Sequence, residues 1–331
     1  MRFTKPQKVS TLDIRSFTHG NEKDQAHFIQ NLGTGLREYG FVIIEGHGVA
    51  SSLIQDCYSK AKTFFALPGE TKNQFIVPQG FGQRGYTALG QEHAKDSEYP
   101  DIKEFWHVGR EIFADKNYQA QYPANIWPDA HVPGFRDSFT TLFSQLEAMA
   151  SSLLEATALY LNLPRKTLSN MIVDGNSIIR ALHYPPLAPA QFVNGAVRAA
   201  AHEDINLITI LCEATESGLE LLNHNGQWLS VESGPGQMVV DSGDMLSRIC
   251  NDIIPSTTHR VVNPAGSKNV ARYSMPFFVH PHSSCPLNIL PTCVSAQNPA
   301  KYSPITADEF LHQRLREIGL IKGERSDGRH R

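Results

Sequence analysis

Residues 218–241 read GLELLNHNGQWLSVESGPGQMVVD, a series of short apolar runs separated by turn-forming residues. Asn225-Gly226 and Gly234-Pro235-Gly236 separate the runs, and such dipeptides and tripeptides mark tight connections between strands. Similar runs surround this stretch: SIIRALHY (177–184), NLITILC (206–212), TTHRVV (257–262) and ARYSMPFFV (271–279). Many short strands at this spacing predict a mainly β core, built as a sandwich, a jelly roll or a barrel.

Helical patterns lie on both sides of this β-rich region. Residues 22–39 and 136–162 repeat apolar side chains at helical spacing, and a further amphipathic helix follows the apolar strand predicted at 41–49. Near the other end, Thr306 and Glu309 have the spacing of a capping box and predict a closing helix. The chain is therefore expected to be helical first, β second and helical again at its end.

The stretch 67–135 is rich in Gly, Pro, Tyr and Trp and has weak periodicity, so it predicts long irregular segments that cover a binding site. Residues 10–17 predict a strand. The changes in composition divide the chain into a helix-rich region (1–170), a β core (171–305) and a C-terminal helix with its tail (306–331). We expect these three regions to form one structural unit.

The composition limits the possible partners. The 331 residues are 41% hydrophobic and 19% charged with a net charge of −3, which excludes disordered, collagen-like and coiled-coil chains. Neither sign of charge forms a long block, so we expect a small-molecule substrate and neither nucleic acid nor a membrane as partner. No apolar run predicts a membrane span or a signal peptide, and the five cysteines form no CxxC pair. These features predict a cytoplasmic protein, as a monomer or weak homodimer.

His202 and Asp204 precede the apolar run INLITIL, and His259 lies in another β-like run, STTHRVV. In extended chain, positions i and i+2 point to one face, so His202 and Asp204 can converge. Two histidines and a carboxylate form the facial triad of non-haem Fe(II) oxygenases, which leaves metal positions open for substrate and O₂. The same set also suits Zn²⁺ in a hydrolase, and each histidine alone is an ordinary strand residue.

Arg272 and Ser274 form a second i, i+2 pair, 13 residues after His259. A guanidinium and a hydroxyl on one strand face can bind a planar carboxylate, with two parallel hydrogen bonds from the arginine. The pair therefore suits a cosubstrate whose far carboxylate is held while its near end chelates the metal.

These motifs occur in series with several others. LREYGFVIIEGHGV (36–49) and RALHYPP (180–186) precede the histidine motif, and CNDIIPSTTHRVV (250–262) and ARYSMPFFVHP (271–281) follow it. In this order the sequence resembles the isopenicillin N synthase-like family of 2-oxoglutarate/Fe(II)-dependent dioxygenases, over most of the chain. The resemblance implies a distorted double-stranded β-helix, or jelly roll, surrounded by α-helices.

The resemblance also implies roles for individual residues. His202, Asp204 and His259 would bind iron, and Arg272 and Ser274 would bind the C5 carboxylate of 2-oxoglutarate. Tyr184 matches a tyrosine that helps hold the cosubstrate, and Arg180 lies where a basic residue often occurs. Leu182 replaces the usual asparagine, so one hydrogen bond to the cosubstrate is missing. Four residues of the loop-rich stretch would cover the substrate, although each also suits a packing role: Arg84, Tyr86, Phe105 and Trp106.

The sequence predicts a non-haem oxygenase that uses Fe(II), 2-oxoglutarate and O₂. Its reaction would hydroxylate, desaturate or cyclise a small organic molecule and release succinate and CO₂. One alternative is an oxidase of the isopenicillin N synthase type, which uses Fe(II) and O₂ without 2-oxoglutarate and gives the Arg-x-Ser pair to its substrate. Another is a metal-free binding module. The sequence does not identify the substrate.

Overall fold

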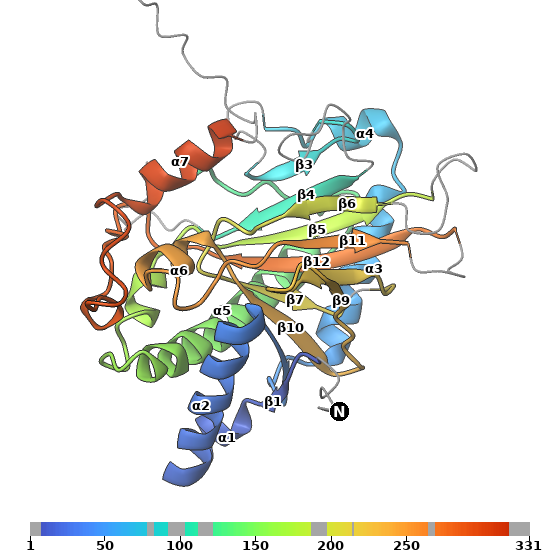
Figure 1. The fold of residues 1–331 in the computed structure, drawn as a ribbon. Helices are drawn as coiled ribbons and strands as arrows, with labels where there is room; N and C mark the ends of the chain where they lie inside the picture. The colour runs from blue at the N-terminus through green and yellow to red at the C-terminus, as the bar shows by residue number, and fades with distance from the viewer. Residues whose placement is uncertain are drawn as a thin grey trace, which may run out of the picture.

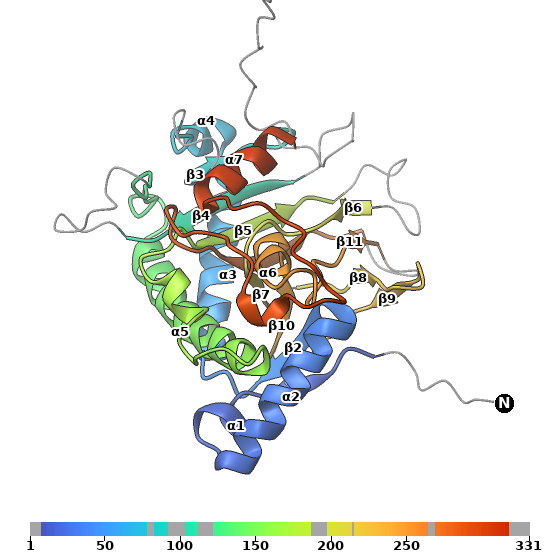
Figure 2. The ribbon, with the colours of Figure 1, turned by 60° about the vertical axis from the view of Figure 1, so that its left-hand side comes forward.

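The structure is a computed structural model that describes residues 8–77, 83–91, 103–111, 122–186, 197–213, 215–263 and 269–317. Its centre is a pair of facing β-sheets (Figures 1 and 2). The larger sheet has the order β1 (Thr11–Asp13), β2 (Phe41–Glu45), β10 (Gln237–Ser242), β7 (Ile208–Cys212), β12 (Arg272–Val279), β5 (Ile178–Tyr184), β4 (Glu104–Gly109), β3 (Gly85–Thr87). The smaller sheet has the order β6 (Val197–His202), β11 (His259–Val262), β8 (Leu219–Leu222), β9 (Trp228–Ser230).

The predicted jelly-roll class is confirmed. Neighbouring strands in both sheets are antiparallel, apart from the parallel pair β1 and β2. The runs that the turn residues separate form the expected strands β5, β7, β8, β9, β10, β11 and β12. Figure 2 shows the smaller sheet on one side of the larger sheet and the helices α3 (Ser51–Phe65) and α5 (Phe135–Tyr160) on the other.

The remaining helices lie around the edges of the two sheets. They are α1 (Arg15–Thr18), α2 (Glu22–Tyr39), α4 (Gly69–Asn73), α6 (Asp244–Ile249), α7 (Ala307–Glu317) and two 3₁₀ turns, Ser169–Ile172 and Pro291–Cys293. The capping box at the start of α7 is present, because the Glu309 backbone N–H donates to Thr306 Oγ1 and the Thr306 N–H donates to Glu309 Oε2. No helix in the described ranges is long and apolar enough to cross a membrane.

Two local predictions are wrong. Within 10–17, only Thr11–Asp13 is a strand, and a helix begins at Arg15 because the Asp13 carboxylate accepts the Arg15 backbone N–H and turns the chain. The stretch 67–135 is not irregular throughout, since it contains α4, β3 and β4. Every residue of β4 is buried, so its pattern shows no alternation that the sequence could reveal.

Two apolar cores lie on opposite faces of the larger sheet. The outer core packs the sheet against α2, α3 and α5. The inner core fills the space between the two sheets, with Phe41, Leu182 and Val239 from one sheet and Leu221 and Val261 from the other. Because side chains alternate along a strand, neighbouring residues of one strand contribute to different cores.

Candidate metal centre and cosubstrate site

Strand pairing brings the two histidines of the predicted triad together. His202 is the last residue of β6 and His259 is the first of β11, and the antiparallel register places them directly opposite each other. Asp204 follows two residues after β6. The Nε2 atoms of His202 and His259 lie 3.8 Å and 4.0 Å from Oδ1 of Asp204. One ligand atom from each of the three residues lies within 4.8 Å of the others.

The other polar atoms of the three side chains already have partners. The Nδ1 atom of His202 donates to the Ala200 carbonyl at 2.8 Å, and that of His259 donates to the Thr257 carbonyl at 3.1 Å. Both Nε2 atoms are thereby left as lone-pair donors. Burial and then the neighbouring His259 lower the pKa of His202 to about 4, so its imidazole is neutral at neutral pH, the form that binds metals.

Asp204 is held by a threonine of the next strand. Thr209 Oγ1 donates to Oδ2 of Asp204 and itself accepts from Asn206 Nδ2 at 2.9 Å. This leaves Oδ1 facing the two histidines. The separations of about 4 Å exceed hydrogen-bond length, so the three atoms converge without bonding one another. Two imidazoles and one carboxylate with an open side fit Fe(II), the metal of the two-histidine, one-carboxylate sites.

The second predicted pair begins β12. Arg272 lies opposite Tyr184 of β5, and Ser274 lies opposite Leu182, a member of the inner core. Arg272 is only 2% exposed, and its guanidinium carbon lies 5.4 Å from the centre of the Tyr184 ring. Its Nε donates to the Glu216 carbonyl, but its buried Nη1 finds no hydrogen-bond partner among the described residues. An unsatisfied buried guanidinium N–H is suited to a carboxylate ligand.

Arg180 lies on the inner face of β5, opposite His107 of β4. Its Nε is 2.5 Å from Nε2 of His107, and its guanidinium stacks on Phe105 at 4.3 Å and on Phe278 at 5.2 Å. Phe105 belongs to the inner core. Phe105 and Arg180 therefore share one wall of the space between the sheets.

The other three predicted pocket residues lie elsewhere. Tyr86 and Trp106 are members of the outer core, where Trp106 packs on Phe64 with a ring separation of 4.6 Å. The Tyr86 hydroxyl donates to Glu104. Arg84 is fully buried beside Gly109, where an added Cβ would collide with the guanidinium, and its Nη2 donates to Asn176 Oδ1 at 3.1 Å. Burial lowers the pKa of Arg84 to about 10.

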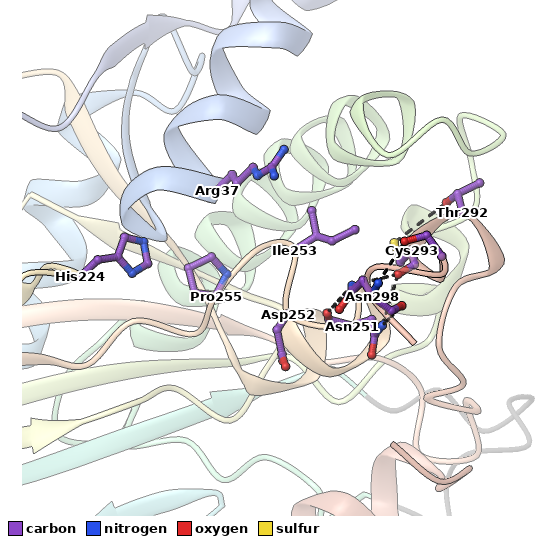
Figure 3. Close-up of a pocket in the computed structure, with 10 residues that line it drawn as sticks. Arg37, His224, Asn251, Asp252, Ile253, Pro255, Thr292, Cys293 and Asn298 are labelled. Carbon is purple, nitrogen blue, oxygen red and sulfur yellow. Dashed lines mark hydrogen bonds between the residues drawn. The ribbon is translucent and has the colours of Figure 1, made fainter. Parts of the chain in front are cut away.

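A pocket of about 450 Å³ lies apart from these residues, between α2, the β8–β9 turn and the 251–298 region (Figure 3). Its lining includes Arg37 and His224 and none of the predicted site residues. Asn251, one of the lining residues, donates to the Cys293 and Asn298 carbonyls, so its amide holds the surrounding loops. The pocket does not have the converging, unsatisfied groups that distinguish the space between the sheets.

Several residues around the site were not predicted. Thr209 and Phe278 occur in apolar runs. The even spacing of Phe278 from Ser274, i+4, could have suggested that both lie on one face of the strand, whereas nothing in the sequence indicated the role of Thr209. His107 follows Trp106 in β4, a strand that the sequence pattern did not reveal. Strand β6 was also missed, because VRAAAH is rich in alanine and lacks the β-branched residues that favour strands.

Comparison with known proteins connects this geometry to a family. Residues 175–281 match the profile of the 2OG-Fe(II) oxygenase superfamily, and residues 9–130 match the profile described as non-haem dioxygenase in morphine synthesis N-terminal. A 2-oxoglutarate-Fe(II) type oxidoreductase of Metarhizium rileyi is 32% identical, over 95% of this chain and 92% of the relative.

Solved structures give the same result. A 2OG-Fe(II) oxygenase family protein from Caulobacter crescentus is 44% identical with a TM-score of 0.84, over 94% of this chain and 99% of that one. A full-length Neurospora crassa protein, solved in complex with alpha-KG, is 29% identical with a TM-score of 0.83, over 93% and 96% of the two chains. With the triad and the buried arginine in one jelly roll, these matches identify the chain as a member of the 2-oxoglutarate/Fe(II)-dependent oxygenase family.

Proposed function

We propose that His202, Asp204 and His259 hold the Fe(II) of this oxygenase, and that Arg272, Ser274 and Tyr184 bind the C5 carboxylate of 2-oxoglutarate. The observation that carries the proposal is the convergence of three ligand atoms within 4.8 Å in the same β-core as a buried arginine with an unsatisfied N–H. When bound, iron, 2-oxoglutarate and O₂ supply oxidising chemistry that side chains lack, with release of succinate and CO₂.

The protein's own groups position these components. The carbonyls of Ala200 and Thr257 hold each imidazole in one tautomer and orientation, and Thr209 fixes the rotation of the Asp204 carboxylate. Phe41 packs edge-on against the His259 ring with centroids 5.6 Å apart, so one side of the site is shielded from water. The side chain of His202 is 41% exposed, which leaves the opposite side open for entry.

The substrate is proposed to be a small organic molecule that meets the wall formed by Phe105 and Arg180. Aromatic faces beside a guanidinium suit a planar or partly polar substrate. Arg180 stays a candidate for contact with either substrate or cosubstrate. Arg84 packs against Gly109 and donates to Asn176, so we propose that it supports the end of β4 and does not contact the substrate. Tyr86 and Trp106 have the positions of packing residues on the outer face, so we propose a supporting role for them.

The proposal also covers the branch of the family, the location and oligomeric state of the protein, and its domain organisation. The motif order supports a place in the isopenicillin N synthase-like branch, and the composition supports a cytoplasmic monomer or weak homodimer without nucleic-acid or membrane partners. Strands from 1–170 form both edges of the larger sheet and strands from 171–305 form its centre, which supports one folding unit for these two regions.

The test is O₂ consumption and succinate release by the Fe(II)-loaded protein, with a library of small organic substrates and with or without 2-oxoglutarate. We expect oxidation only when 2-oxoglutarate is present, with one succinate formed per turnover. Substrate oxidation without 2-oxoglutarate, and no succinate in its presence, would instead identify an oxidase that needs no cosubstrate. Failure to retain Fe(II) after anaerobic loading would favour a metal-free binding module.

A further inference from the structure

A second buried arginine lies at the same end of the β-core as Arg272. Arg198 is in β6, four residues before His202, and is 8% exposed. The sequence motifs give no reason to single it out. Buried arginines are rare unless they are paired, so its surroundings require an explanation.

The contacts of Arg198 place its guanidinium beside the entry to β12. Its Nε donates to Oδ1 of Asn263, just after β11, and its Nη2 donates to the Val270 carbonyl at 3.0 Å. Val270 is two residues before Arg272. Arg198 belongs to the smaller sheet and Arg272 to the larger one, so the two arginines approach each other across the junction of the sheets.

The two guanidinium groups lie near some of the same ionisable side chains. Burial lowers the pKa of Arg198, and the positive charge of Arg272 lowers it further, while Glu216 and Tyr184 raise the pKa of both guanidinium groups. The nearby Glu216 side chain is on an exposed residue and forms no hydrogen bond with either guanidinium in the described part of the chain. Two cations of like charge are therefore buried near one tyrosine.

Three N–H-bearing atoms of this cluster lack partners. Nη1 of Arg198, Nη1 of Arg272 and Nδ2 of Asn263 are all buried, and none has a hydrogen-bond acceptor within the described ranges. A buried donor that is left without an acceptor destabilises the folded protein, because it has lost its hydrogen bonds to water. A bound anion would satisfy the donors and also relieve the repulsion between the guanidinium groups.

We propose that Arg198 is a second guanidinium for the distal carboxylate of 2-oxoglutarate, and that it acts together with Arg272. This inference rests on the proposed function, which provides the carboxylate. Arg198 is a cosubstrate-binding and specificity-determining residue, and the two arginines favour a dicarboxylic 2-oxo acid over a monocarboxylic one. Because they come from different sheets, the cosubstrate also connects the two sheets at this end.

The test is an anaerobic titration of the Fe(II)-loaded full-length protein with two ligands. One is 2-oxoglutarate, and the other is 2-oxopentanoate, which keeps the metal-chelating end but has no distal carboxylate. We expect Arg198→Met to raise the Kd for 2-oxoglutarate about 10-fold or more, as for loss of one charge-assisted hydrogen bond. The Kd for 2-oxopentanoate stays within about 2-fold of wild type, since that ligand makes no such bond.

The matched control is Arg260→Met in the neighbouring strand β11. Arg260 pairs with Glu220 and stacks on Trp228, and its replacement is expected to leave both Kd values unchanged. An Arg198→Met protein that binds 2-oxoglutarate as tightly as wild type, or that loses affinity for both ligands equally, overturns the proposal and leaves Arg198 as a clamp on Asn263 and Val270. If Arg198→Met does not fold, Arg198→Lys is measured in its place. The proposal is then overturned if the ratio of the Kd for 2-oxoglutarate to the Kd for 2-oxopentanoate is the same as in the wild-type protein. A wild-type protein that does not bind 2-oxoglutarate contradicts the proposed function itself.

Discussion

The two ends of the proposed active site differ in how their polar groups are satisfied. At the metal end, the Nδ1 atom of each histidine bonds to a backbone carbonyl, and Thr209 holds the outer oxygen of Asp204. At the carboxylate end, the guanidinium groups of Arg272 and Arg198 each retain a buried nitrogen without a partner among the described residues.

This difference shows which parts of the site the protein completes by itself. The orientation of the metal ligands is determined by neighbouring groups of the chain, so the metal end is preorganised. At the carboxylate end, the buried guanidinium N–H groups have a hydrogen-bond acceptor only when an anion is bound. Changes at the first end should therefore affect iron binding, and changes at the second should affect cosubstrate affinity.

The largest effect is expected from Asp204→Ala, which removes one of the three proposed metal ligands. Iron retention after anaerobic loading and succinate release should both fall to background, and His202→Ala and His259→Ala should behave alike. Glu203→Ala is the control, because this side chain bonds to Thr258 and not to the metal site. Near-native activity of a folded Asp204→Ala protein would refute the assignment of the triad.

Zinc should inhibit the enzyme almost as completely. Zn²⁺ lies above Fe²⁺ in the affinity order for nitrogen and oxygen ligands, so it displaces iron, but it has no redox chemistry. Succinate release should fall as Zn²⁺ is added to the Fe(II)-loaded enzyme. Stimulation of a hydrolytic activity by Zn²⁺ in iron-free buffer would favour a zinc hydrolase.

Arg272→Lys tests the carboxylate end. Lysine keeps the charge but loses the planar pair of donors, so the KM for 2-oxoglutarate should rise roughly 10- to 100-fold, for a loss of about 1.4–2.8 kcal/mol. The kcat should fall less, because the other end of the cosubstrate still chelates iron. Initial rates over a range of 2-oxoglutarate concentrations measure both. A rise in the KM of the primary substrate alone would indicate the oxidase mechanism.

Thr209→Val tests the preorganisation of the metal end. Valine has a similar shape but cannot donate to Asp204, so the affinity for Fe(II) should fall by about 10-fold, the lower end of the range for such supporting residues. Thr209→Ser restores the hydroxyl and should restore the affinity. Anaerobic iron titration is the measurement, and an unchanged iron Kd in Thr209→Val would show that the threonine is not needed to hold the carboxylate.

Ser274→Ala should have the smallest effect. It removes one neutral donor, which contributes about 0.5–1.5 kcal/mol, so the KM for 2-oxoglutarate should rise roughly 2- to 12-fold. The iron affinity should stay the same, in contrast to Thr209→Val. A change in iron affinity without a change in this KM would contradict the separation of the two ends.

The sequence was sufficient to predict those features that depend only on residues close together in the chain. Short apolar runs bounded by turn residues, such as QMVVD, predicted strands without knowledge of the tertiary structure. The positions of His202 and Asp204, and of Arg272 and Ser274, predicted pairs on one strand face because extended chain repeats every two residues. Strands β4 and β6 escaped prediction, because one is buried throughout and the other is rich in alanine.

What the sequence determined by itself was the class of fold and the candidates for the site, namely the three proposed metal ligands and the arginine–serine pair, since these follow from residue type and the order of motifs. The tertiary structure decided which side chains share the space between the sheets. His202 lies opposite His259 because of the register between β6 and β11, and Arg198 approaches Arg272 because two sheets meet there. Such proximity arises from pairing between residues far apart in the chain, which no local pattern encodes.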